Sequence, residues 1–175
     1  MAIPVKVTWQ DTNAPQLTEA ASSLLAVLDF ALLNNGWSKD FTDTDVAVYR
    51  APSGNRKYYR IHDNNGYGYN GLYSAKVTGY DSMTDANTGA GWGSVSYIRK
   101  ARSSGNKRWL VFVDAYGFMV ITQPAGDTTT DVNTYPFIPH YIGDDVVLMP
   151  GNTPRAVICA AKDSSDDSYG GGSVS

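Results

Sequence analysis

The sequence is poor in cysteine, in charge and in long apolar runs. A single cysteine, Cys159, stands among 175 residues, which excludes an internal disulfide and a zinc site built from cysteines alone. No charged-then-apolar leader opens the chain, and no apolar run reaches the roughly 18 residues that a membrane-spanning helix needs. We therefore expect no membrane span, no secretion signal and synthesis in a cytoplasm.

The charge balance argues against a nucleic-acid partner. Charged residues make up only 18% of the chain and the formal net charge is −3, with a pI near 5.2. Basic residues gather between Arg99 and Arg108, but they flank a Ser-Gly-Asn turn and no wider basic surface accompanies them. A solvated loop rim is the more economical interpretation.

Residues suited to catalysis are also few. His62 and His140 are the only histidines, and each lies in or near an apolar strand segment. Cys159 sits in an apolar run that gives no sign of thiolate stabilisation, and no serine occurs in a G-x-S-x-G setting. We expect neither an enzyme nor a cofactor.

One loop resembles a calcium-binding pattern. Asp81, Asp85, Asn87 and Gly89 give the spacing D-x-x-x-D-x-N-x-G, but the bidentate glutamate that would complete such a loop is absent. Ordinary turn chemistry is favoured, and a metal in this loop stays an open alternative.

What the chain does contain predicts a β-hairpin at its centre. Two runs rich in β-branched and aromatic residues, Trp109–Val113 and Phe118–Thr122, flank the turn Asp114–Gly117. Alternation places apolar side chains on both faces of both strands. We expect the hairpin to lie in the middle of the structure with both faces covered.

One amphipathic helix is predicted before it, over residues 18–35. Thr18 is the expected N-cap and Gly36 stands just past the end. The apolar stripe that would cover the hairpin comprises Leu17, Ala21, Leu24, Leu25, Leu28 and Leu32.

The remaining elements are short strands separated by turns. No second long helix is available to carry a parallel crossover, so the fold class is α+β: a mainly antiparallel, sandwich-like sheet domain with the N-terminal helix packed on it. The expected strands are Val46–Arg50, Lys57–Asp63, Ala75–Asp81, Val95–Lys100, Val146–Met149 and Ala156–Ala161, with an extended segment at Pro136–His140.

The termini divide the chain into an extended arm (1–12), a single globular domain (13–162) and a Gly/Ser/Asp-rich tail (163–175). Pro4 removes a backbone donor, so the first segment is an edge strand or an arm rather than a central strand. The tail cannot bury enough apolar area to order itself. We expect both ends to lie against neighbouring subunits, with backbone pairing along Ile3–Val7; the contact candidates are Ile3, Val5, Val7, Trp9, Tyr169 and Val174.

Aromatic residues near the Tyr/Gly-rich segment offer a second kind of surface. Aromatic rings pack on sugar faces, so Tyr67, Tyr69, Tyr73 and Trp92 are candidates for a glycan-binding surface. Cross-strand pairing of tyrosines explains the same pattern without a ligand and is favoured.

Several segments together resemble a family of small virion proteins of tailed bacteriophages. The most specific are GYDSMTDANTG (79–89) and NKRWLVFVDAYGFMV (106–120), and the others, in family order, are NAPQL, LLAVLDFALLNNGW, AVYRAP, YYRIHDN and YIRKA. The resemblance covers roughly residues 13–120. It implies a non-enzymatic structural component of the virion, made in the bacterial host cytoplasm and located in the tail, the baseplate or on the capsid. Its implied partners are copies of itself and other virion proteins. Display of a host-receptor or glycan-binding surface is the alternative.

Overall fold

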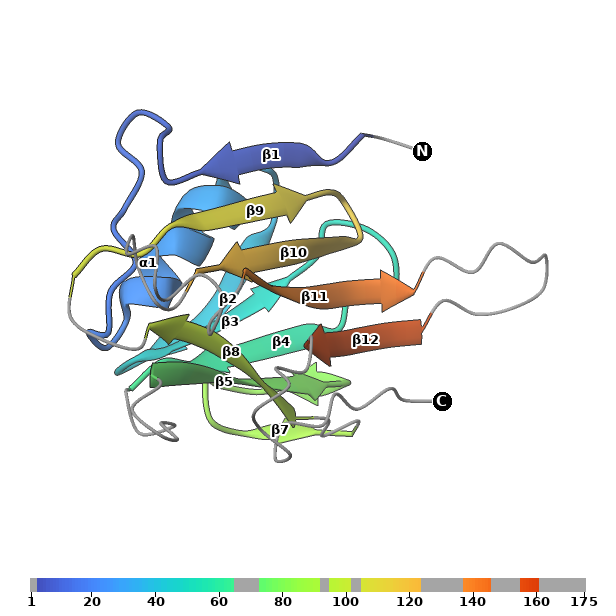
Figure 1. The fold of residues 1–175 in the computed structure, drawn as a ribbon. Coiled ribbons are helices and arrows are strands. Elements are labelled where there is room, and N and C mark those ends of the chain that lie inside the picture. Colours follow the sequence, from blue (N-terminus) through green and yellow to red (C-terminus); the bar gives the residue numbers. More distant parts are fainter. Residues whose placement is uncertain are drawn as a thin grey trace.

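The computed structural model describes residues 3–64, 73–91, 95–101, 105–123, 137–145 and 155–160, with residue 145 and residues 155–160 described by backbone alone. Two five-stranded antiparallel sheets dominate this part of the chain, with one short helical segment between them (Figure 1). The predicted fold class, mainly antiparallel β with one N-terminal helix, is confirmed.

Each sheet has a simple strand order. Sheet I joins the first strand to the last four, in the order β1 (Val5–Thr8), β9 (Trp109–Val113), β10 (Gly117–Thr122), β11 (Ile138–Asp145) and β12 (Arg155–Ala160). Sheet II has the order β2 (Ser38–Asp43), β3 (Val46–Arg50), β4 (Tyr58–His62), β5 (Tyr73–Tyr80) and β8 (Val95–Ala101). A small hairpin, β6 (Ser82–Met83) with β7 (Gly89–Ala90), leaves sheet II between β5 and β8.

The two sheets approach one another on one side and are held apart on the other. The edge strand β12 of sheet I contacts β8 and β5 of sheet II. On the opposite side, the end of the helical segment contacts both β9 and β2 (Figure 1). The helix therefore fills the open side of a two-sheet sandwich.

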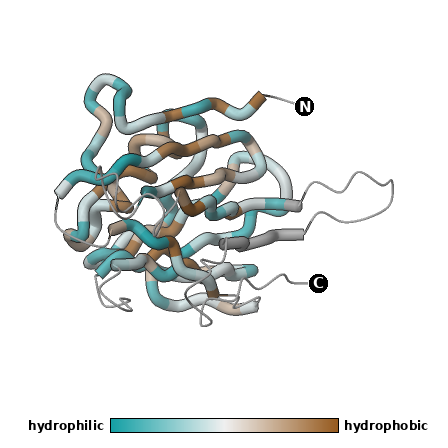
Figure 2. Tube along the Cα trace, in the orientation of Figure 1, coloured by the Kyte–Doolittle hydropathy of each residue, from teal (hydrophilic) through white to brown (hydrophobic). Residues whose placement is uncertain are grey.

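Alternating side chains of both sheets and one face of the helix build the core. Trp109, Val111 and Val113 of β9 are buried, and the edge of the Phe30 ring meets Trp109 at a centroid distance of 6.4 Å. Hydrophobic stretches of the chain gather in this interior (Figure 2). Each fully buried large apolar side chain contributes about 1.5–3 kcal/mol before conformational entropy is subtracted. The sandwich is thus held mainly by its shared core.

The central hairpin is confirmed as β9 and β10, flanked by β1 and β11, but the expectation that both faces are covered is wrong. Leu110 and Phe112 of β9 are only half-buried, as are Met119 and Ile121 of β10. Sheet II and the helix pack against one face of sheet I, so the alternate side chains lie on its outer surface.

The predicted helix starts too early. Regular helix begins at α1 (Ser23–Leu28) and continues as a π-helical turn, η1 (Asp29–Leu33). Thr18 is not its cap: the hydroxyl of Thr18 accepts the N–H of Ala20 in a local turn instead. Gly36, with φ +85°, follows the end as expected. The buried stripe is confirmed for the leucines that lie within the helix, Leu24, Leu25, Leu28 and Leu32.

The beginning of α1 is capped by a residue far away in sequence. Ser22, in the left-handed region at φ 61°, makes no side-chain capping bond. The N–H of Leu24 instead donates to Oδ2 of Asp63, which directly follows β4, at 2.9 Å. A carboxylate at a helix start satisfies an unpaired donor and interacts favourably with the helix dipole. Leu17, expected on the helical stripe, forms an isolated β-bridge with Lys107.

Candidate functional site

The outer edge of sheet I is the first candidate surface. β1 is the last strand on its side of the sheet and pairs with β9 of the same chain. The backbone groups on one edge of the predicted N-terminal arm are therefore hydrogen-bonded within the chain. Ile3, Val5 and Val7 alternate with Pro4 and Lys6, but only Val7 is covered. Its exposed fraction is 7%, against 49% for Val5 and 89% for Ile3. An apolar row thus runs out of the core onto the surface.

The backbone of β1 offers few groups for pairing at its outer edge. Residue Trp9 donates its N–H to Trp109 O, so alternation turns the N–H groups of residues 4, 6 and 8 outward. Pro4 has no N–H, and the N–H of Thr8 donates to Oδ2 of Asp11 at 2.8 Å. Within the described edge, Lys6 alone keeps an outward N–H. A partner strand laid along Ile3–Val7 would therefore receive few backbone hydrogen bonds from this edge.

Trp9 is held at the end of this edge while remaining partly accessible. Its exposed fraction is 36%, and the Arg108 guanidinium lies over its ring at 5.7 Å from the centroid. Such a cation–π contact orients an exposed ring at a modest gain of about 0.5–1 kcal/mol. The remaining contact candidates, Tyr169 and Val174, lie outside the described residues.

The predicted aromatic ligand surface is only partly described. Tyr73 begins β5 and is half-buried, whereas Tyr67, Tyr69 and Trp92 lie outside the described residues. An aromatic group on sheet II was not predicted from the sequence. Phe41 and Tyr58 lie at a centroid distance of 6.3 Å, with Arg50 over the Tyr58 ring at 5.1 Å. Alternation in the segment KYYRIHD was an available signal for Tyr58 alone.

The Asp81–Gly89 loop uses its polar groups on itself and on sheet II. Oδ1 of Asp85 accepts the N–H groups of Asn87 and Thr88 at 2.7 and 2.8 Å, and these hydrogen bonds lower the pKa of Asp85. Arg60 of β4 donates to the backbone oxygen of Ala86 and to Oδ1 of Asn87. Within the described part of the chain, no three His, Cys, Asp or Glu residues group as metal ligands. Two oxygens of this loop therefore already accept hydrogen bonds from the Arg60 guanidinium.

Of the two histidines, His140 is enclosed within the fold. His140 is 2% exposed on β11, and neither ring nitrogen has a hydrogen-bond partner among the described residues. Burial, followed by repulsion from Arg99, lowers the pKa of His140 to about 3, so the ring is neutral at pH 7. The strand register sets Cys159 opposite Tyr141, not opposite His140. The register therefore gives no support to a nucleophile pair formed by Cys159 and His140.

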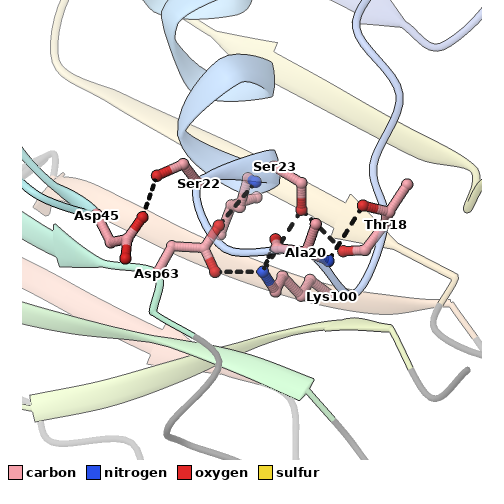
Figure 3. A network of polar contacts seen from close by, with 8 residues as sticks. Thr18, Ala20, Ser22, Ser23, Asp45, Asp63 and Lys100 are labelled. Atoms are coloured by element: carbon pink, nitrogen blue, oxygen red, sulfur yellow. Dashed lines mark hydrogen bonds and ion pairs between the residues drawn. The ribbon is translucent and has the colours of Figure 1, made fainter. Parts of the chain in front are cut away.

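A buried ion pair is the strongest polar feature of the described chain. Lys100 of β8 contacts Oδ1 of Asp63, and both side chains have an exposed fraction of 0% (Figure 3). The Lys100 ammonium also donates to Ala20 O at 2.6 Å and to Ser23 Oγ at 3.4 Å. Burial raises the pKa of Asp63, while the Lys100 charge opposes that shift. Sequence reasoning missed this pair, although Lys100 shares its strand face with the buried Ser96 and Ile98.

Comparison with known proteins identifies no relative: no family model, no curated protein and no solved structure matches this chain. No helix in the described ranges is both long and apolar enough to cross a membrane.

Proposed function

We propose that this chain is a non-enzymatic structural subunit of a tailed-bacteriophage virion that docks on neighbouring subunits through its N-terminal edge. The observation that carries the proposal is the incomplete burial of the row Ile3, Val5 and Val7 at the end of sheet I. Exposed apolar side chains that continue a core row at a sheet edge are suited to a partner surface. The motif resemblance to phage virion proteins supplies the kind of particle.

The shape of this edge favours docking by side chains over extended strand addition. Pro4 and the Asp11–Thr8 bond leave Lys6 as the one outward donor of the described edge. Burying Ile3 and Val5 against a partner would contribute about 1.5–3 kcal/mol each before entropy is subtracted. Backbone hydrogen bonding at Lys6 would fix the orientation of the partner subunit relative to β1. Copies of the chain and other virion proteins, in tail, baseplate or capsid, are the proposed partners.

Display of a glycan-binding surface receives no comparable support. Of its four candidate residues only Tyr73 is described, and it is half-buried within sheet II. Binding of the isolated protein to host polysaccharide, lost on Tyr69→Ala, would favour that alternative.

The test is quantitative mass spectrometry of purified virions, combined with two variants. The wild-type chain is expected at on the order of tens to hundreds of copies per particle, as a symmetric structural component requires. Val5→Asp places a charge in the exposed apolar row and should strongly reduce incorporation. Thr42→Asp, which adds the same charge at an exposed position of β2, should incorporate normally.

Circular dichroism of both isolated variants controls for folding. Absence of the chain from purified particles would refute the proposal. So would normal incorporation of a folded Val5→Asp protein.

A further inference from the structure

Lys100 and Asp63 present an amine and a carboxyl group to each other in a site closed to water. Both side chains are fully buried and in direct contact. Asp63 directly follows β4, Lys100 lies in β8, and β5 separates these two strands in sheet II. The pair therefore bridges across β5, next to the edge strand β8, and lies beneath the start of α1 (Figure 3).

The surrounding hydrogen bonds hold both groups in fixed orientations. Besides Asp63, the Lys100 nitrogen has Ala20 O at 2.6 Å and Ser23 Oγ at 3.4 Å as acceptors. The Ser23 hydroxyl donates its own hydrogen to Thr18 O at 2.8 Å, so it presents a lone pair to Lys100. If the proton facing Asp63 moves to that carboxylate, the amine keeps two acceptors for its two hydrogens. Its lone pair then points toward Oδ1 of Asp63, one bond away from the carboxyl carbon that it would attack.

We propose that Lys100 and Asp63 become joined by an intramolecular isopeptide bond. The Lys100 nitrogen attacks Cγ of Asp63, the N–C bond forms, and the bond from Cγ to Oδ1 breaks. Oδ1 leaves as water with two hydrogens from the ammonium group, and the third hydrogen stays on the amide nitrogen. The condensation needs no oxidant or co-reactant.

Three features of the site favour this step. Burial raises the pKa of Asp63, which favours the protonated carboxyl that can lose water. The N–H of Leu24 donates to Oδ2 at 2.9 Å and can stabilise the negative charge that develops on that oxygen during attack. Contact between two held groups replaces a bimolecular encounter by an intramolecular one. The product is neutral, so the desolvation penalty of a buried ion pair is removed.

The bond would fasten the edge of sheet II to the helix start. β8 is an outer strand of that sheet, and Asp63 caps α1 through Leu24. A covalent link here would resist separation of β8 from β4 under load.

Intact-mass spectrometry of the denatured full-length protein is the test. Loss of one water lowers the mass by about 18 Da relative to the mass calculated from the sequence. Proteolysis should yield a branched peptide that joins the segment containing Asp63 to the segment containing Lys100. The full, unlinked mass would overturn the proposal.

Two variants separate this bond from other losses of water. Lys100→Arg keeps the positive charge but removes the amine, and it should restore the full mass. Lys57→Arg alters the solvent-accessible pair Lys57–Asp81 and should leave the deficit unchanged. A succinimide elsewhere would also lower the mass by about 18 Da. A deficit that persists in Lys100→Arg, or that maps away from Asp63, would contradict the proposal; if that variant fails to fold, the wild-type peptide map decides.

Discussion

Acidification is expected to destabilise the fold through His140. The ring is buried without a hydrogen-bond partner in the described chain, and burial lowers its pKa from 6.5 to about 3. Between these two values the unfolded chain binds a proton at this position and the folded chain does not. Stability therefore falls as the pH is lowered through the unfolded pKa, and the loss is complete near the folded pKa.

The size of the effect follows from the two pKa values. Each pH unit in this window is worth about 1.4 kcal/mol. Between pH 7 and about pH 4.5, His140 should thus lower the free energy of unfolding by about 2.5 kcal/mol. Because the contributions of carboxylates overlap in this range, the measured quantity is the difference between wild type and a variant.

The variant is His140→Leu, which keeps a side chain of similar size and removes the titrating group. At pH 7 it should be at least as stable as wild type, because it removes two buried nitrogens that have no hydrogen-bond partner among the described residues. Its loss of stability on acidification should be smaller by about 2.5 kcal/mol in urea unfolding followed by tryptophan fluorescence.

His62→Gln is the matched control. Burial also lowers the pKa of His62, but its side chain is only half-buried on β4, so most of the acid sensitivity should remain. If wild type and His140→Leu lose the same stability between the two pH values, the reasoning about His140 is refuted.

Two further substitutions test packing and hydrogen bonding in urea unfolding. Gly143→Ala should cost about 1–3 kcal/mol, because its Cβ would lie 2.3 Å from the Gly117 Cα in the neighbouring strand. Gly36→Ala, with φ +85° and no atom within 4 Å, should cost only about 1 kcal/mol, and equal losses in the two variants would contradict this account. Tyr49→Phe should cost about 1.5–3 kcal/mol, because the buried hydroxyl donates to the Asp29 carboxylate at 2.8 Å; an unchanged midpoint would refute that role.

Local patterns were sufficient for several strands and for the central hairpin, but they did not predict β2 or the small hairpin of β6 and β7. The expected strand Val46–Arg50 coincides with β3, and the Trp109–Thr122 hairpin forms β9 and β10 with its turn in place. These elements follow from period-two alternation and turn residues, which act over a few positions. How the strands divide between two sheets did not follow, because that depends on contacts between distant segments.

The start of the helix could not be predicted from its own residues. Thr18 and Glu19 look like a cap and a first turn, yet the donor at Leu24 is satisfied by Asp63 at a separation of 39 residues. A local rule favours the nearest polar side chain. In this fold, the ion pair with Lys100 places a better acceptor at the helix start, and the chain before Ser23 stays irregular.

The candidate surface at the N-terminal edge could likewise be predicted from the sequence only in part. The edge position of the N-terminal strand follows from Pro4, and the structure agrees in placing β1 at the end of sheet I. The exposure of Ile3 and Val5 could not be read from the sequence, because alternation alone assigns them to the same covered row as Val7. The cover ends within the strand itself: Val5, the first residue of β1, pairs with Val113 but is 49% exposed, whereas Val7 is 7% exposed.

A cryo-EM reconstruction of the virion tests the central claim most directly. The account predicts density for this two-sheet domain at a symmetric position in the tail, the baseplate or the capsid. It also predicts that a neighbouring subunit covers Ile3 and Val5 beside β1. A particle that lacks the domain, or one in which the outer edge of β1 faces solvent in every copy, would contradict the account.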